Sequence, residues 1–110
     1  MQRLIFIILI ILSPFSYAST TGMTNITEIM LDEGNGVKLY FKVAETIPTD
    51  GSCSTNQNWP YVFDISTEFG KSMYSAVLAA YIGQLDVQVF GYGTCDVHNA
   101  VETVKRIEFK

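Results

Sequence analysis

The sequence predicts a single small α+β domain with five strands and one helix, in the order β-β-β-α-β-β. Three observations lead to this prediction. Apolar and polar residues alternate over residues 37–43, which is the period of a half-buried strand. Apolar residues recur at helical spacing from residue 69 onward. A chain of 110 residues with 48% hydrophobic content has room for one domain and its core.

The first eighteen residues have the pattern of a signal peptide. Arg3 gives a positive start, residues 4–12 form an unbroken apolar run, and Pro14 ends it. Ser16 and Ala18 then place small residues at the −3 and −1 positions of a cleavage site. Nine helical residues rise only about 14 Å, roughly half of a bilayer core. We therefore expect removal of residues 1–18 rather than retention as a membrane anchor.

Export leaves an acidic domain at residues 19–110, located in the periplasm or secreted. Without Arg3 its net charge changes from −4 to −5. Such a surface repels phosphate backbones and anionic lipid heads, so the charge disfavours a nucleic-acid binder.

Cys53 and Cys95 are the two cysteines of the chain. An oxidising compartment favours a structural disulfide between them, and redox or metal chemistry is the alternative. By the chain-entropy treatment, a closed loop of this length stabilises the fold by about 4 kcal/mol. A metal site would need further ligands, and His98 is the single histidine, so no metal or cofactor is predicted.

Three strands precede the helix. Residues 26–31 are β-prone, and Asn35-Gly36 is a strong hairpin signal between them and the alternating strand 37–43. Residues 46–58 are rich in Thr, Ser, Asn, Gly and Pro and are typical of a long loop. Residues 59–65 form the third strand, with Tyr61, Phe63 and Ile65 on one face.

The helix begins after Ser66 or Thr67, either of which can cap it, and Gly83 ends it. One side of the helix should form a buried stripe, and the small and polar residues on the opposite side indicate contact with water or with a close neighbour. We expect the buried stripe to consist of Phe69, Met73, Ala76, Val77, Ala80, Tyr81 and Ile82, and the opposite side of Lys71, Ser72, Ser75 and Ala79.

Two strands follow the helix, at residues 85–90 and 101–109, although the apolar spacing of the last segment also permits a helix. A helix between the third and fourth of five strands is the order of the OB-fold, a small, largely antiparallel barrel. An open antiparallel sheet with one packed helix satisfies the same order.

Patterns that carry catalysis are weak in this chain. Gly70-Lys71-Ser72 imitates the end of a phosphate-binding loop, but Ile65 stands where that motif requires glycine. Asp64 and Glu68 could form an acidic pair, although capping and solvation explain both. Asp96 and His98 are too few for a metal site. We predict no enzyme, with a small hydrolase using Asp64 or His98 as the remaining catalytic hypothesis.

Aromatic residues near loops are the better candidates for ligand binding. Trp59, Tyr61 and Tyr92 are of the type that stacks on sugar rings or anchors a protein partner. Core packing is the alternative for Trp59 and Tyr61, whereas Tyr92 lies between two glycines.

Several segments between residues 53 and 104 carry a resemblance to known proteins. They are Cys53-Ser54, Trp59, Phe63, Gly70-Lys71-Ser72-Met73-Tyr74-Ser75, Leu78, Ala80, Gly91-Tyr92-Gly93-Thr94-Cys95-Asp96 and Glu102-Thr103-Val104. Together they resemble a group of small exported proteins of Gram-negative bacteria, most of them uncharacterised. The order of a cysteine, a loop, a tryptophan-containing strand, a Tyr-rich helix and a valine strand resembles, more distantly, the B subunit of subtilase-type AB5 toxins.

The resemblance to the toxin subunit implies an OB-fold, a ring of five subunits and binding of host glycans. In such a ring the helix would line a central channel, with Lys71, Ser72 and Ser75 pointing inward. The family's sugar-contacting residues lie in segments without a match here, so none is carried over. Our leading hypothesis is a secreted or periplasmic glycan-binding module, and the alternative is a periplasmic accessory factor or inhibitor that binds another protein.

Overall fold

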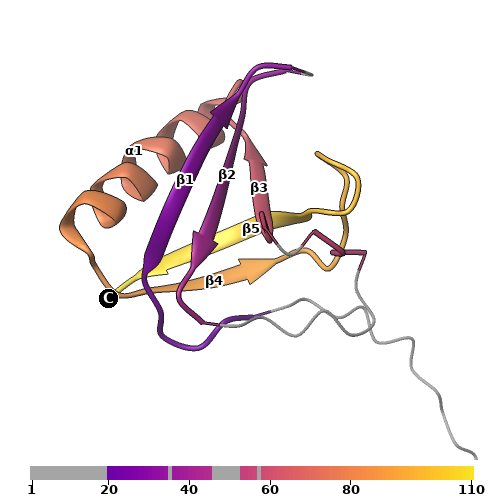
Figure 1. The fold of residues 1–110 in the computed structure, drawn as a ribbon. Helices are drawn as coiled ribbons and strands as arrows, with labels where there is room; N and C mark the ends of the chain where they lie inside the picture. Colours follow the sequence, from indigo (N-terminus) through magenta and orange to yellow (C-terminus); the bar gives the residue numbers. More distant parts are fainter. Residues whose placement is uncertain (1–19, 35, 46–52, 57) are drawn as a thin grey trace, which may run out of the picture.

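The computed structural model describes residues 20–34, 36–45, 53–56 and 58–110. The predicted signal peptide, residues 1–18, and its cleavage site lie outside this part of the chain. The described residues form five strands and one helix in the expected order (Figure 1). The elements are β1 (Ile26–Asp32), β2 (Lys38–Val43), β3 (Tyr61–Asp64), α1 (Glu68–Gly83), β4 (Val87–Gly91) and β5 (Glu102–Phe109).

The strands form one mixed sheet in the order β1-β2-β3-β5-β4. The pairs β1–β2, β2–β3 and β4–β5 are antiparallel, whereas β3 and β5 are parallel. The sheet is thus largely antiparallel, as predicted, and β3–β5 is the parallel pair among the described strands. The reason is the connection, because α1 and β4 return the chain to the edge from which β3 started, and β5 then runs in the direction of β3.

The residues before β1 lie along β4, the strand at the opposite end of the sheet. Thr20 bridges to Phe90 and Thr24 to Val87, both antiparallel. The amide of Thr21 donates to the carbonyl of Val89 at 3.0 Å. The chain thus enters β1, at one end of the strand order, directly from β4, at the other end. In Figure 1, β4 and β5 run across the direction of β1, β2 and β3.

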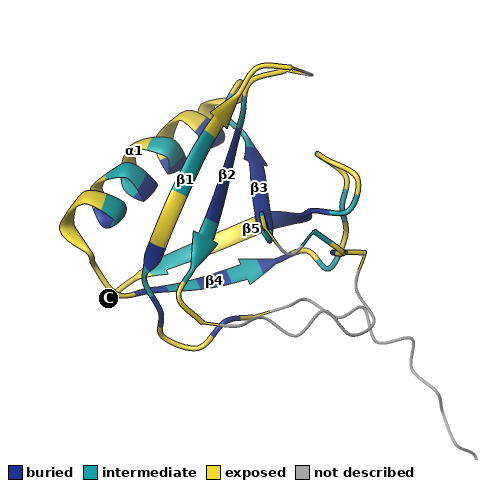
Figure 2. Ribbon diagram, viewed as in Figure 1, coloured by how far each residue is buried: buried dark blue, intermediate teal, exposed yellow. Residues whose placement is uncertain are grey.

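The core lies between these strands and α1 (Figure 2). β2 contributes Leu39 and Phe41, both fully buried, and the Phe41 ring stacks on Tyr61 of β3 with centroids 5.3 Å apart. The alternating pattern of the sequence is responsible, because every second residue of a strand points to the same face. The helix adds Met73, Val77 and Ala80.

The first turn of α1 corrects part of the predicted buried stripe. Thr67 caps the helix, and its hydroxyl accepts from the amide of Gly70 at 2.9 Å. Gly70 rather than Phe69 faces the sheet, because a Cβ at residue 70 would lie 1.9 Å from the carbonyl oxygen of Asp64. The side chain of Phe69 is 62% exposed as a result.

The last turn differs from the prediction in two respects. Ile82, expected in the buried stripe, is 74% exposed, because the stripe ends at Ala80. Gly83 still belongs to the helix, and Gln84 adopts the left-handed conformation that ends it, with φ of 50°. The amide of Leu85 then donates to the carbonyl of Ala80 at 3.0 Å.

The helical alternative for the last segment is wrong. Residues 102–109 pair with β4 through Val89–Ile107 and Phe90–Arg106, so tertiary pairing decides an ambiguous local pattern. In the part of the chain that the structure describes, no helix is both long and apolar enough to cross a membrane.

Candidate functional site

A second apolar cluster lies on the outer face of β1, β2 and β3. The alternation that sends Leu39 and Phe41 inward turns Tyr40 outward, and the register places Met30 and Val62 on either side of it. Yet Tyr40 is only 3% exposed and Val62 is fully buried. Something therefore covers the centre of an outer face, where a strand of this pattern would ordinarily meet water.

The cover comes from the loop between β4 and β5 and from the residues before β3. Val97 and Val101 of the loop pack against Tyr40 and Val62, together with Trp59. The ring of His98 meets Tyr40 edge-on at a centroid distance of 5.4 Å, and Trp59 meets it at 6.4 Å. A hydrogen bond also joins the Tyr40 hydroxyl to Nδ1 of His98. We call Tyr40, Trp59, His98, Lys42 and Met30 the aromatic platform.

Charged groups lie within and beside the aromatic platform. The ammonium of Lys42 lies 5.2 Å from the centroid of the Trp59 ring and 3.3 Å from a carboxylate oxygen of Glu28. Both partners keep exposed side-chain area, so the ion pair adds little stability and its groups can exchange water for a ligand. Burial raises the pKa of Tyr40 above 10.0, and the Asp32 carboxylate raises it further.

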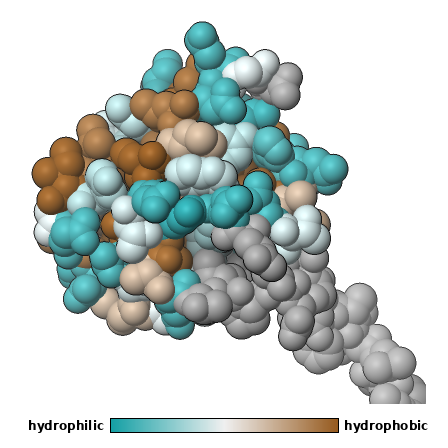
Figure 3. Space-filling model, viewed as in Figure 1, coloured by the Kyte–Doolittle hydropathy of each residue, from teal (hydrophilic) through white to brown (hydrophobic). Residues whose placement is uncertain are grey.

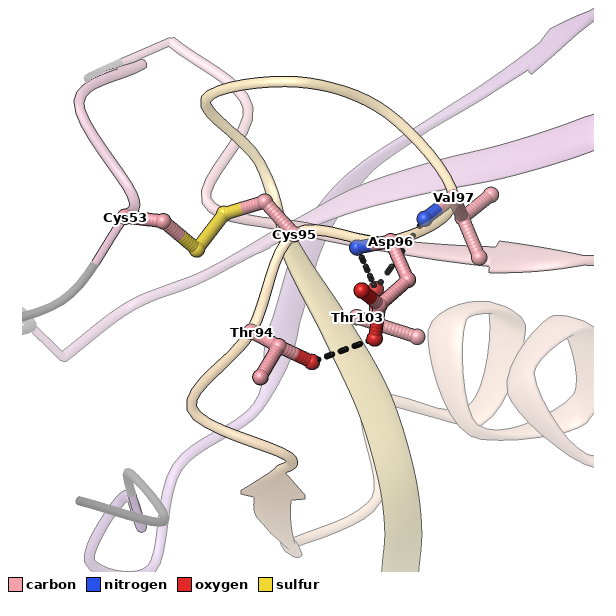
Figure 4. Close-up of a disulfide and its surroundings, with 6 residues drawn as sticks. All are labelled: Cys53, Thr94, Cys95, Asp96, Val97 and Thr103. Atoms are coloured by element: carbon pink, nitrogen blue, oxygen red, sulfur yellow. Dashed lines mark hydrogen bonds between the residues drawn. A yellow bond between two sulfur atoms is a disulfide. The ribbon is translucent and has the colours of Figure 1, made fainter. Parts of the chain in front are cut away.

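Figure 4 shows how the covering loop is held in place. The predicted disulfide is confirmed: Cys53 and Cys95 are joined, with Cα atoms 5.9 Å apart. The hydroxyl of Thr103, on β5, accepts from the amides of Asp96 at 3.1 Å and Val97 at 3.3 Å. A covalent bond and two hydrogen bonds thus fix the loop immediately before His98.

The position of Trp59 is set by its own neighbours. The side-chain oxygen of Asn56 accepts from the amides of Asn58 at 2.9 Å and Trp59 at 3.0 Å, which makes a tight turn before β3. The amides of Thr55 and Asn56 donate to the carbonyl of Ala100 in the loop between β4 and β5. The two segments that cover Tyr40 are therefore hydrogen-bonded to each other.

The three aromatic binding candidates occupy three different environments. Trp59 belongs to the aromatic platform and is partly exposed. Tyr61 is 1% exposed and stacks on Phe41, so its ring belongs to the core and is not available to a ligand at the surface. The reason is strand parity, since Tyr61 shares its face of β3 with Phe63. Tyr92 is 52% exposed at the end of β4, with Lys105 over its ring.

The helix residues expected to face a neighbour are at the surface. Lys71, Ser72 and Ser75 are all exposed, and Lys71 forms an ion pair with Glu68 at 3.5 Å. Exposed apolar side chains, Phe69 and Ile82, lie near the two ends of the same helix. Figure 3 shows hydrophobic residues gathered on the side where α1 and β1 lie, whereas hydrophilic residues cover much of the front.

The catalytic candidates take part in local bonds. Asp64 accepts hydrogen bonds from the Ser66 hydroxyl and amide, and these bonds lower its pKa below 3.8, aided by the charge of Lys38. Asp96 accepts from the Thr94 hydroxyl at 2.6 Å, and His98 is bonded to Tyr40. Among the described residues, no group of three or more His, Cys, Asp and Glu side chains is arranged to hold a metal.

Tyr40 and Lys42 are site residues that the sequence analysis missed. Both lie in the alternating strand, where their parity predicts a solvent-facing position beside Lys38. A tyrosine between two lysines on that face is the available signal, because a large ring on a solvent-facing strand position is stabilised when another segment packs against it. The partner comes from the loop between β4 and β5, more than fifty residues away along the chain.

The comparisons with known proteins add no relative. No family model, no curated protein and no solved structure matches the chain.

Proposed function

We propose that the protein is a secreted or periplasmic, non-catalytic binding module whose ligand contacts the aromatic platform. The observation that carries this proposal is the placement of Trp59. It is the single tryptophan of the chain, it is partly exposed, and it lies at the margin of a cluster fixed by a disulfide. An aromatic ring held this rigidly loses little conformational entropy when a ligand stacks on it.

The strand arrangement supports an OB-type barrel. The order β1-β2-β3-β5-β4, the helix between β3 and β4 and the bridges from Thr20 and Thr24 to β4 agree with a closed five-stranded Greek-key barrel. Barrels of this type bind oligonucleotides and oligosaccharides on the face of the second and third strands and on the adjoining loops. Tyr40 and Val62 lie on the outer face of these two strands.

An oligosaccharide suits this surface better than an oligonucleotide. The chain has a net charge of −4, which opposes a phosphate backbone. Sugar rings present apolar faces to aromatic side chains and hydroxyl groups to charged ones. The aromatic platform offers the Trp59 ring beside Lys42 and Glu28, and this juxtaposition supports a glycan ligand.

A glycan array with paired variants tests the proposal. We expect the wild-type protein to retain at least one glycan, and Trp59→Ala to lose that signal by about tenfold or more. Phe109→Ala is the matched control, because it also truncates an exposed aromatic residue but at the end of β5. An empty array, or equal loss in both variants, contradicts a glycan site on the aromatic platform.

A homopentamer is the assembly that the resemblance to AB5 toxin B subunits implies. The exposure of Lys71, Ser72 and Ser75 supports it, since residues lining a central channel must be accessible in the single chain. Phe69 and Ile82 supply apolar area that neighbouring subunits could cover. Native mass spectrometry at micromolar concentration should detect five copies, and monomer alone throughout that range contradicts the ring.

The second candidate function is binding to another protein in the periplasm, as an accessory factor or inhibitor. The exposed Phe69 and Ile82 favour it, because apolar side chains of this size at a surface are typical of protein interfaces. In a pull-down from periplasmic extract, a partner retained by the wild type and lost with Ile82→Asp supports this candidate. Retention of the same partner by Ile82→Asp contradicts this interface.

A further inference from the structure

The outer face of β4 and β5 carries two cation–ring pairs side by side. The guanidinium carbon of Arg106 lies 4.1 Å from the centroid of the Phe90 ring, and the Lys105 ammonium lies 6.0 Å from that of Tyr92. Neither pair belongs to the aromatic platform. We call these four residues the cationic surface.

An irregularity in the strand pairing produces this arrangement. Phe90 is opposite Arg106 and Gly91 is opposite Val104, so Lys105 is the extra residue of a β-bulge. In a regular strand, residues 105 and 106 would point to opposite faces, but here both are exposed. Phe90 and Tyr92 share a face because they are two residues apart, and Gly91 between them points inward, close to the buried Glu102.

Positive charge exceeds negative charge at this place, although the whole chain is acidic. Glu108 is the acid that pairs with this group of cations, and it is shared between Arg106 at 3.5 Å and Lys110 at 3.0 Å. Over residues 102–110, three cations (Lys105, Arg106 and Lys110) outnumber two acids (Glu102 and Glu108), a formal charge of +1, whereas the whole chain carries −4.

Nε of Arg106 pairs with Glu108, so an incoming anionic group would use the terminal N–H groups of the guanidinium or displace this exposed ion pair. A guanidinium that stacks on a ring keeps the N–H groups of its edge available, and these match the paired oxygens of a carboxylate or sulfate. Lys105 adds a second charge, and Tyr92 is exposed enough for a sugar ring to contact it.

We propose that the cationic surface binds a polyanionic glycan, through the sulfate or carboxylate groups of its sugars. An anionic membrane is less suitable, because basic segments that bind membranes carry four to eight basic residues. A protein partner is also less suitable, because Arg106 stacks on Phe90 and Lys105 lies near Tyr92, so charged groups accompany both rings of this surface. The site shares no residue with the aromatic platform, so the two binding proposals are tested independently of each other.

Titration of the full-length protein with a heparin-derived hexasaccharide, at about 50 mM sodium chloride, tests this proposal. The double variant Lys105→Gln/Arg106→Gln should raise the dissociation constant about tenfold and reduce the slope of its dependence on salt concentration. Lys71→Gln removes one exposed charge on α1 and should leave the constant within about twofold. Trp59→Ala should leave it unchanged as well, which separates this site from the aromatic platform.

Arg106 packs on Phe90, so its replacement could disturb folding, and circular dichroism must show native spectra for the variants compared. Lys105→Gln alone, with its side chain exposed, should still weaken binding by about threefold. Three results overturn the proposal: no hexasaccharide binding at about 50 mM salt, an equal loss with Lys71→Gln, or binding to phosphatidylglycerol vesicles without binding to the hexasaccharide.

Discussion

At the scale of single residues, a few positions are determined by contacts that their neighbours in sequence do not reveal. Tyr40 is the clearest. Its strand assigns it to the solvent side, yet a loop from the far end of the chain covers it and a histidine bonds to its hydroxyl. Burial of a tyrosine in this position gives the outer face of the sheet a rigid centre and an accessible margin, which supports the proposed binding surface.

Gly70 is determined in the same way, by the backbone of the strand before the helix. A Cβ at this position would lie 1.9 Å from the Asp64 carbonyl oxygen, and a backbone atom cannot move aside cheaply. We expect Gly70→Ala to lower the free energy of unfolding by about 3 kcal/mol, measured by urea denaturation. Ser75→Ala, on the exposed side of the same helix, should change it by less than about 0.5 kcal/mol. Equal values for the two variants would show that the β3–α1 junction is not closely packed.

Asp64 predicts an acid-dependent contribution to stability. Its pKa lies below 3.8 in the folded protein, chiefly because the Ser66 hydroxyl and amide donate to it. The folded state therefore favours the carboxylate, and this stabilisation is present above about pH 4 and lost as the pH falls through the lowered pKa.

Urea unfolding of the wild type and of Asp64→Asn at pH 7 and at about pH 2.5 measures this effect. The wild type should have the higher urea midpoint at pH 7, and the difference should narrow at the lower pH. A difference that stays constant or widens in acid contradicts the contribution assigned to Asp64.

At the scale of elements, the loop between β4 and β5 is the part on which the site depends. It connects two strands, yet its contacts go to β2, β3 and the segment before β3. The disulfide is the covalent part of this attachment, because it joins the loop to residue 53.

Replacement of both cysteines by serine should therefore have two effects. The free energy of unfolding should fall by about 4 kcal/mol, because the unfolded chain regains the freedom of a long loop. Amide exchange of residues 96–101 should also accelerate more than that of α1. Uniform acceleration across both segments would indicate that the disulfide stabilises the whole domain without a particular effect on the site.

At the scale of the whole molecule, sequence reasoning predicts the order of the elements but not which of them contact one another. Local signals suffice for the β1–β2 hairpin, the cap at Thr67 and the alternating strand, since each depends on a few adjacent residues. The parallel pairing of β3 with β5 and the covering of Tyr40 depend on residues distant in sequence, so no local pattern contains them.

The errors of the sequence analysis have the same origin. The sequence analysis places Phe69 in the buried stripe because it is hydrophobic. In the structure Gly70 faces the strand instead, because the Asp64 carbonyl approaches too closely for a side chain. For Tyr61 the sequence analysis leaves both binding and core packing open, and its strand parity takes it to the core. Net charge likewise describes the molecule as acidic, while the bulge at Lys105 concentrates positive charge on one face.

The most direct test of the central claim uses the single indole group of the protein. Trp59 contributes one indole N–H signal to a ¹⁵N correlation spectrum, because the chain has one tryptophan. Titrated with a panel of oligosaccharides, that signal should shift for at least one compound, together with the amides of Tyr40 and His98, while the amides of α1 stay in place. A panel that leaves the indole signal unmoved, or shifts confined to α1, would contradict a glycan site on the aromatic platform.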